Sequence, residues 1–196
     1  MSNPTVTESE ILERFAPIVA RSLRIAPERV TADAYLSDLG AESLDLLEIT
    51  MDTEDEFGVV MPQNDILHVG QEVFGEGILV REGAVTEQGA RFLQRRLPFD
   101  REAITVGRPV ADVARVFQRV GTWVRVIQGL LEQSPTKCPS CGSPLSKPVA
   151  ARAKCTSCDT QVDLPAGDDL NRRWVEEYYR TEAAQAGSAH AASAEH

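Results

Sequence analysis

Apolar residues recur every three or four positions in two stretches near the beginning of the chain. The first stretch contains Ile11, Leu12, Phe15, Val19 and Leu23. It follows Thr7 and Glu10, which have the spacing of a capping box, so a helix is predicted over residues 8–24. Pro17 should kink this helix or move its start, because proline removes a donor and crowds the previous turn. The second predicted helix begins at Ser43 and ends near Gly58.

The hydrophobic signal weakens after Pro62. A short strand is predicted over residues 78–80 and a capped helix over 86–96, ended by Pro98. Residues 110–133 indicate one interrupted helix or two consecutive helices, with Gly121 and Thr122 as the joint. The apolar spacing of 168–182 predicts a last helix, and the low-complexity stretch 184–196 is expected to be disordered.

Composition and charge narrow the possible functions. With 196 residues, 42% hydrophobic and 6% aromatic, the chain can bury one modest core and a small satellite. Residues 1–80 carry 4 Arg against 16 Asp and Glu, which repels nucleic-acid phosphates and attracts basic protein partners. No apolar run has the length of a membrane span, and the start, MSNPTVTESEIL, lacks the features of a signal peptide. We therefore expect a cytoplasmic protein that does not bind membranes and whose acidic N-terminal domain does not bind nucleic acid.

The predicted helix over 43–57 has two apolar stripes on opposite sides, although one stripe is enough to pack on a core. Acidic residues fill the remaining arc, and residues 42–57 contain no Lys or Arg that could pair with them within the helix. The surface is either an ordinary soluble face with scattered exposed leucines or a docking surface for a basic, apolar groove. The predicted docking residues are Glu42, Leu44, Asp45, Leu47, Glu48, Met51, Asp52, Asp55 and Glu56.

The stretch from Val30 to Pro62, VTADAYLSDLGAESLDLLEITMDTEDEFGVVMP, resembles the signature of the acyl carrier protein family. The resemblance rests on Asp-Leu-Gly at 38–40, the Ser-Leu-Asp start at 43–45 and the closing Phe57 to Pro62. It implies that Ser43 is the attachment point for 4′-phosphopantetheine, transferred from coenzyme A by a phosphopantetheinyl transferase. The alternative is that Ser43 is merely the N-cap of the helix.

The resemblance further implies a carrier and not an enzyme: a phosphoprotein that holds acyl groups as thioesters for fatty-acid or polyketide biosynthesis. Its partners would include a ketosynthase, an acyltransferase or an acyl-activating ligase. Two residues depart from the family pattern. Glu42 stands where Asp is usual, which affects the choice of transferase, and Thr53 stands at an apolar core position. We expect the Thr53 hydroxyl to bond back to a helix carbonyl, because an unpaired buried hydroxyl costs about 1–3 kcal/mol.

The sequence predicts a carrier bundle over 1–133 with an irregular insertion at about 64–118. Residues 122–133 have the spacing of a closing helix that packs beside the first two. The insertion is basic, because residues 81–125 contain nine Arg against five acids. It could fold back on the acidic helix, recruit a second partner, or pack with an ordinary mixed surface.

The four cysteines form two Cys-x-x-Cys pairs, Cys138 with Cys141 and Cys155 with Cys158, separated by thirteen residues. This spacing resembles a zinc ribbon, in which four thiolates close a structural site without an open position for catalysis. A redox pair and a nucleic-acid-binding ribbon are the alternatives.

The sequence therefore predicts an all-α, acyl-carrier-like helical bundle with an irregular insertion, a small four-cysteine zinc ribbon over 134–165 and a C-terminal helix over 166–183. Leu170, Trp174 and Tyr178 would pack this helix on the ribbon or on the bundle. Phosphopantetheine and structural Zn²⁺ are the expected cofactors. Two other functions remain open: an unmodified carrier-like adaptor, or a zinc-ribbon protein that binds nucleic acid.

Overall fold

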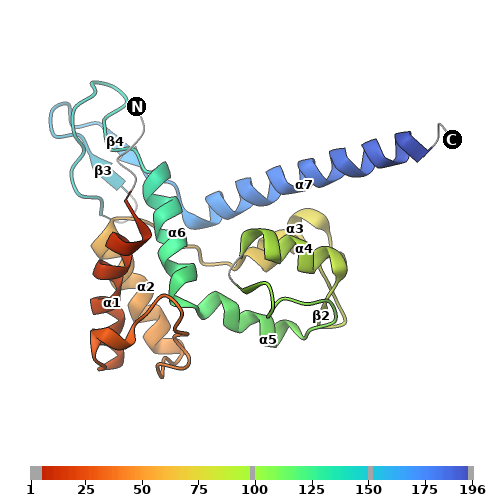
Figure 1. Cartoon of the computed structure of the whole chain (residues 1–196). Helices are drawn as coiled ribbons and strands as arrows, with labels where there is room; N and C mark the ends of the chain where they lie inside the picture. Colours follow the sequence, from red (N-terminus) through yellow and green to blue (C-terminus); the bar gives the residue numbers. More distant parts are fainter. Residues whose placement is uncertain (1–5, 98–99, 150–151, 194–196) are drawn as a thin grey trace. The chain divides into compact units, whose positions relative to one another are not determined.

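The computed structural model describes residues 6–97, 100–149 and 152–193, and from 183 onward only the backbone. The chain divides into two compact units (Figure 1). Unit 1 combines residues 1–63 with 111–167, and unit 2 combines 64–110 with 168–196. Each unit is therefore built from two separate stretches of the sequence.

Three helices form the body of unit 1: α1 (Glu8–Leu23), α2 (Ser43–Phe57) and α6 (Val120–Gln133). A single 3₁₀ turn, η1 (Pro27–Arg29), follows α1. The predicted capping box is confirmed: the Thr7 N–H donates to the Glu10 carboxylate at 2.8 Å, and the Glu10 N–H donates to the Thr7 hydroxyl at 3.2 Å. Pro17 lies inside α1 and does not move its start.

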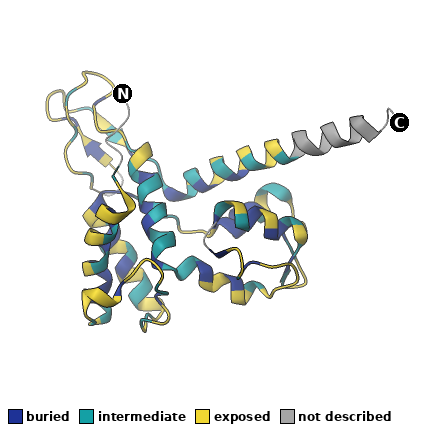
Figure 2. Ribbon diagram, viewed as in Figure 1, coloured by how far each residue is buried: buried dark blue, intermediate teal, exposed yellow. Residues whose placement is uncertain are grey.

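The core of unit 1 lies where α1 contacts α2 and α6. The inner faces of these helices are buried and their outer faces exposed (Figure 2). Phe15 of α1 is fully buried and stacks on Trp123 of α6, with ring centroids 5.7 Å apart. The buried apolar residues of the three helices are Ile11, Phe15, Ile18, Val19, Ala20, Ile49, Phe57, Val120, Val124, Ile127 and Leu130. The predicted closing helix thus completes a helical bundle.

The segment before α6 is interrupted at a different residue from the one predicted. Helix α5 (Val110–Ala114) runs into a 3₁₀ turn, η3 (Arg115–Gln118), and Arg119 is extended before α6 begins. Gly121 lies within α6, so its prediction as the joint is wrong. A Cβ atom on Gly121 would lie 2.9 Å from the Ala32 carbonyl oxygen, so the glycine permits close packing and does not form a turn.

The cysteine module, residues 137–164, contains a two-stranded antiparallel sheet of β3 (Arg152–Lys154) and β4 (Gln161–Asp163). Among its described residues, Ala153 and Leu164 are the buried apolar ones besides two of the cysteines. An isolated bridge between Leu145 and Cys155 joins the two halves of the module. Residues 150 and 151 of the predicted ribbon lie outside the described residues.

Unit 2 is more regular than the irregular insertion expected at 64–118. It contains α3 (Ile66–Phe74), a hairpin of β1 (Val80–Arg81) and β2 (Ala84–Val85), and α4 (Glu87–Arg96). Helix α4 was predicted, with Thr86 as its cap, whereas α3 was missed. Pro98, predicted to end α4, lies outside the described residues.

Helix α7 (Gly167–Ser193) packs its aromatic side chains within unit 2. The ring of Phe92 lies 5.4 Å from both Trp174 and Tyr178, and Phe74 lies 4.9 Å from Tyr179. The prediction that this seam packs on the ribbon or the bundle is therefore wrong.

Helical backbone also extends over residues 184–193, which were expected to be disordered, and 194–196 lie outside the described residues. In the described part of the chain, no helix combines the length and apolar character needed to span a membrane.

Candidate functional site

Ser43 is the first residue of α2, and its side chain is exposed. The N-cap position belongs to Glu42, whose N–H donates to the Asp45 carboxylate at 2.8 Å. Within the described residues, no hydrogen bond engages the Ser43 hydroxyl or the backbone N–H groups of Ser43 and Leu44. A group attached to this hydroxyl would therefore meet free N–H donors and the positive end of the helix dipole.

The loop before Ser43 is anchored by the segment that returns from unit 2. Leu36 is fully buried, and its N–H donates to the Gln118 carbonyl at 2.9 Å. The Val120 N–H donates to the Ala34 carbonyl at 2.9 Å. Two ion pairs, Arg115 with Asp38 and Arg119 with Asp33, connect the same segments. Sequence reasoning did not identify these contacts, because the partners are more than 70 residues apart.

The two apolar stripes of α2 have different environments. Ile49, Thr53 and Phe57 are buried against the bundle. Leu44, Leu47 and Met51 are 81%, 57% and 59% exposed. An exposed apolar row beside Ser43 is available to a partner protein, since nothing within the described residues of unit 1 covers it.

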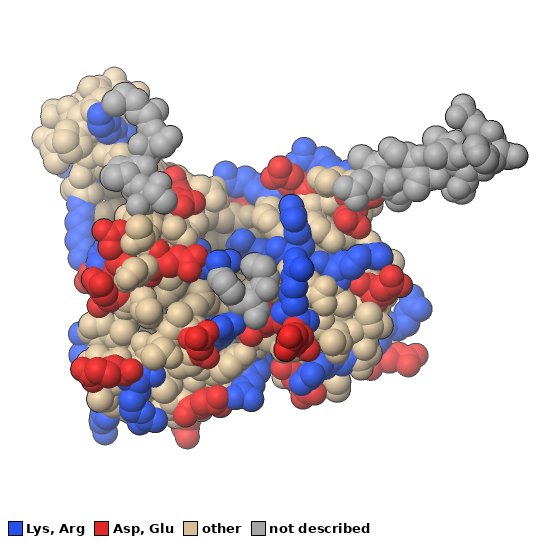
Figure 3. Space-filling model, in the orientation of Figure 1, with Lys and Arg blue, Asp and Glu red and all other residues tan. Residues whose placement is uncertain are grey.

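The acidic residues of α2 are partly neutralised by arginines of α1, outside the helix itself. Arg14 of α1 pairs with Glu56 at 2.8 Å, and Arg21 pairs with Asp52 at 2.7 Å. The Asp52 carboxylate raises the pKa of Arg21. The Ser22 hydroxyl also donates to Glu48 at 3.0 Å. On the face shown in Figure 3, acidic and basic side chains likewise lie beside one another.

The buried Thr53 hydroxyl donates to the Ile49 carbonyl at 2.6 Å. This is the predicted bond back to the preceding helical turn, and it satisfies the only polar side-chain group that α2 buries in the described core. The departure from an apolar residue therefore leaves no unpaired donor in the described part of the bundle.

The four cysteine sulfurs all lie within 4.8 Å of one another and form no disulfide. Cys138 and Cys158 Sγ are 3.6 Å apart, and Cys141 and Cys155 Sγ are 3.4 Å apart. A tetrahedron with Zn–S bonds of about 2.3 Å has S···S edges of about 3.8 Å, so the four side chains fit a zinc ion.

Neighbouring groups act differently on the individual thiols. Thr160, whose hydroxyl is 3.1 Å from Cys158 Sγ, lowers the pKa of that thiol, and Ser143 lowers the pKa of Cys141. At Cys155, hydrogen bonds from the Ser157 and Cys158 N–H groups lower the pKa of the thiol, whereas burial and the neighbouring thiols raise it. The net effect raises the pKa of Cys155 to about 11.

Unit 1 is a small helical bundle, and Ser43 is exposed at the N-terminus of its second helix. The family described as "Phosphopantetheine attachment site" matches residues 13–70. The acyl carrier protein of Zymomonas mobilis is 41% identical over 63 residues, which cover 32% of this chain and 81% of that protein. Those of Thermosynechococcus vestitus and Caulobacter vibrioides are each 44% identical, over 31% of this chain and 75% and 80% of their own lengths.

The chain belongs to the acyl carrier protein family. No solved structure matches it significantly. The match ends at residue 70, so the cysteine module and most of unit 2 lie outside the shared segment.

Proposed function

We propose that Ser43 carries 4′-phosphopantetheine and that the protein presents acyl groups to enzymes of fatty-acid, polyketide or related biosynthesis. The observation that carries this proposal is the exposed Ser43 hydroxyl at the start of α2, within the segment that matches the family. In the modification, the Ser43 oxygen forms a bond to the phosphorus of the arm, the bond from that phosphorus to the nucleotide of coenzyme A breaks, and the hydroxyl proton is released.

The residues around Ser43 support this role. The N–H groups of Ser43 and Leu44 would hold the phosphodiester, and the loop anchored through Leu36 would keep the hydroxyl at the surface. When bound, the arm supplies a thiol that carries the cargo as a thioester. The protein itself would act as a carrier and not as an enzyme, working in the cytoplasm with a phosphopantetheinyl transferase and then with a ketosynthase, an acyltransferase or an acyl-activating ligase.

The exposed row of Leu44, Leu47 and Met51 would be the main docking surface for these partners. Glu42, Asp45, Glu48, Asp52, Asp55 and Glu56 complete the proposed surface. Because Asp52 and Glu56 are already paired with α1, a basic partner must compete with Arg21 and Arg14 for them. We therefore infer that burial of the leucines contributes more to affinity than the acids do.

We further propose that Cys138, Cys141, Cys155 and Cys158 bind a structural Zn²⁺. The fit of their sulfurs to a tetrahedron supports this, and four protein ligands leave no coordination position for catalysis. Two cations of the module are already paired, Arg152 with Asp163 and Lys154 with Asp159, each at 2.9 Å. This pairing disfavours the alternative that the module binds nucleic acid. That alternative predicts a salt-dependent gel shift with DNA or RNA.

The attachment is tested by intact mass spectrometry. The purified chain, incubated with coenzyme A and a broad-range phosphopantetheinyl transferase, should gain the mass of one phosphopantetheine. Ser43→Ala should show no gain, whereas Ser37→Ala, in the exposed loop before it, should be modified like the wild type. A folded wild-type chain that gains no mass would contradict the carrier function and favour an unmodified adaptor that binds partners through Leu44, Leu47 and Met51.

A further inference from the structure

Helix α2 presents a stripe of carboxylates to α1. Glu48, Asp52 and Glu56 are four residues apart, so they lie along one side of the helix. Side chains of α1 meet the stripe in the reverse order, as antiparallel helices require. The contacts are from Ser22 to Glu48 at 3.0 Å, from Arg21 to Asp52 at 2.7 Å and from Arg14 to Glu56 at 2.8 Å. The acidic stripe of α2 is thus engaged by its own protein.

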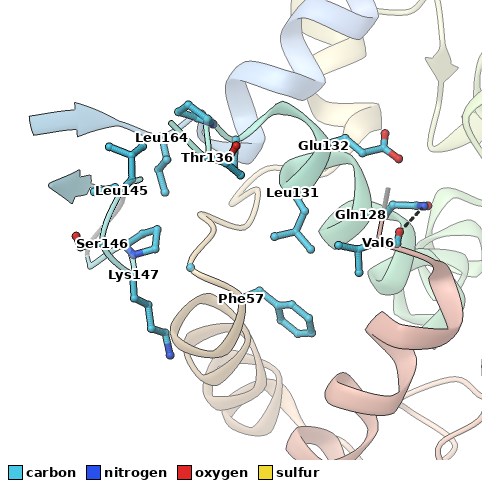
Figure 4. Close-up of a pocket in the computed structure, with 15 residues that line it drawn as sticks. Val6, Phe57, Gln128, Leu131, Glu132, Thr136, Leu145, Ser146, Lys147 and Leu164 are labelled. Atoms are coloured by element: carbon cyan, nitrogen blue, oxygen red, sulfur yellow. Dashed lines mark hydrogen bonds between the residues drawn. The ribbon is translucent and has the colours of Figure 1, made fainter. Parts of the chain in front are cut away.

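The guanidinium of Arg14 has the most contacts of this set. Its Nε and Nη2 donate to Glu56 Oε1 at 3.0 and 2.8 Å, and Nη2 also donates to the Glu56 carbonyl at 3.1 Å. The guanidinium lies over the ring of Phe57, 4.3 Å from its centroid. Phe57 is buried at the end of α2, where it lines a cavity of about 360 Å³ with Leu131 of α6 (Figure 4). A partner that approaches Glu56 must therefore displace a well-held cation.

The other acidic residues of α2 differ in whether they are engaged. Glu42 and Asp45 form a capping box at the start of the helix. Glu54 accepts from a backbone N–H in the segment after α2 at 2.8 Å. Asp55 is exposed, and within the part of the chain that the structure describes no hydrogen bond or ion pair engages its carboxylate. Asp55 is therefore the acid of α2 that a partner can bind without competition.

Asp55 continues the exposed apolar row by one helical turn. It follows Met51 by four residues, which places it about 6 Å farther along the axis and about 40° around it. The outward face of α2 therefore offers Leu44, Leu47 and Met51, followed by one free carboxylate. The complementary surface is an apolar groove with a single cation at the end distant from Ser43. A groove with several cations would meet acids that are already neutralised.

We propose that Arg14 and Arg21 are specificity-determining residues of the docking surface. They occupy the acids that a strongly basic partner would use, so each contact such a partner makes to Asp52 or Glu56 replaces one within the chain. The chain thereby selects partners with an apolar groove and one cation opposite Asp55 over partners with several cations. This inference rests on the proposed attachment at Ser43, because the transferase and later partners dock beside that residue.

The test uses a broad-range phosphopantetheinyl transferase with Lys and Arg on its carrier-binding face, and a variant of it with Gln in their place. Mass-spectrometric kinetics give kcat/KM for modification of the full chain at low and high salt, and circular dichroism verifies the fold. Arg14→Gln and Arg21→Gln should each raise kcat/KM with the basic transferase about two- to fivefold at low salt, through a lower KM. High salt or the neutral transferase should remove the gain.

Three further variants separate release of an acid from a general change of charge. Arg29→Gln removes the same charge from an exposed position for which the described residues include no ion-pair partner, and it should leave kcat/KM within about twofold. Asp52→Asn added to Arg21→Gln removes the released carboxylate and should cancel the gain. Asp55→Asn should lower kcat/KM with the basic transferase about two- to fivefold.

The specificity assignment is wrong if Arg14→Gln and Arg21→Gln behave like Arg29→Gln, or if the gain survives Asp52→Asn. An unchanged kcat/KM in Asp55→Asn would also overturn it, and this variant alters only an exposed side chain. None of these results affects the carrier function. Absence of modification in every chain would instead contradict that function, and calorimetric affinities of the same chains for the transferase would still test the two arginines.

Discussion

The Leu→Ala substitution can be compared at a buried and at an exposed position close to Ser43. Leu36 is fully buried beneath the loop, and Leu44 is 81% exposed beside Ser43. Leu36→Ala should lower the free energy of unfolding by about 3 kcal/mol, because buried Leu→Ala changes cost about 2–5 kcal/mol in transfer and cavity terms. Leu44→Ala should change it by less than about 0.5 kcal/mol, because it removes no buried contact.

In partner binding the order is reversed: Leu44→Ala should have the larger effect and Leu36→Ala the smaller. If Leu44 is buried in the complex with the transferase, its truncation loses about 1.5–3 kcal/mol, which lowers kcat/KM for modification roughly 10- to 100-fold. Leu36→Ala, assayed where it remains folded, should lose less. Urea unfolding followed by circular dichroism measures the first quantity, and mass-spectrometric modification kinetics measure the second.

Equal destabilisation by the two substitutions would refute this reasoning. It would mean that the Leu44 side chain packs against its own protein and that α2 has no free apolar row. Unchanged modification kinetics in Leu44→Ala would instead remove this residue from the transferase docking surface.

Three further predictions concern the metal, the packing of α6 and the response to pH. Cys155→Ser or chelation should expose the amides of residues 137–164 to rapid hydrogen exchange while α1 stays protected, because the module has little apolar core of its own. Gly121→Ala should destabilise the chain by about 1–3 kcal/mol in urea unfolding, since its Cβ would lie 2.9 Å from the Ala32 oxygen. Hydrogen bonds from the Thr7 backbone N–H and hydroxyl lower the pKa of Glu10, so its stabilisation is present above the unfolded value of 4.5 and is lost as pH falls through the lower folded value. The Tm of Glu10→Gln should accordingly lie below that of the wild type at pH 7 and converge with it in acid.

Features set by neighbouring residues could be predicted from the sequence. The capping box of Thr7 and Glu10, the bounds of α2, the cap of α4 and the bond from Thr53 to its helix all depend on partners three or four residues away.

Helix α3 was missed because Gly70 and Gly75 weaken its pattern. Gly70 is needed for packing, since a Cβ there would lie 2.6 Å from Leu79 Cδ1. The Asp65 side chain, which accepts from the His68 N–H at 2.8 Å, was the available signal for its start.

Features that depend on distant partners could not be predicted. The neutralisation of Glu56 and Asp52 comes from Arg14 and Arg21, 42 and 31 residues away. No periodicity within α2 contains that information. The partner of α7 was likewise misassigned, because an aromatic seam shows that a helix packs but not which residues, here Phe92 and Phe74, it packs against.

The split of unit 1 across the sequence has a consequence for biosynthesis. Helices α1 and α2 leave the ribosome before α6, which ends at Gln133 and supplies the third wall of their core. The 76 residues between Phe57 and Gln133 take about 4–15 s to translate at about 5–20 residues per second. During that interval the apolar faces of the first two helices lack their partner, so the nascent chain cannot complete its fold, or fix the loop that presents Ser43, until most of the protein has been made.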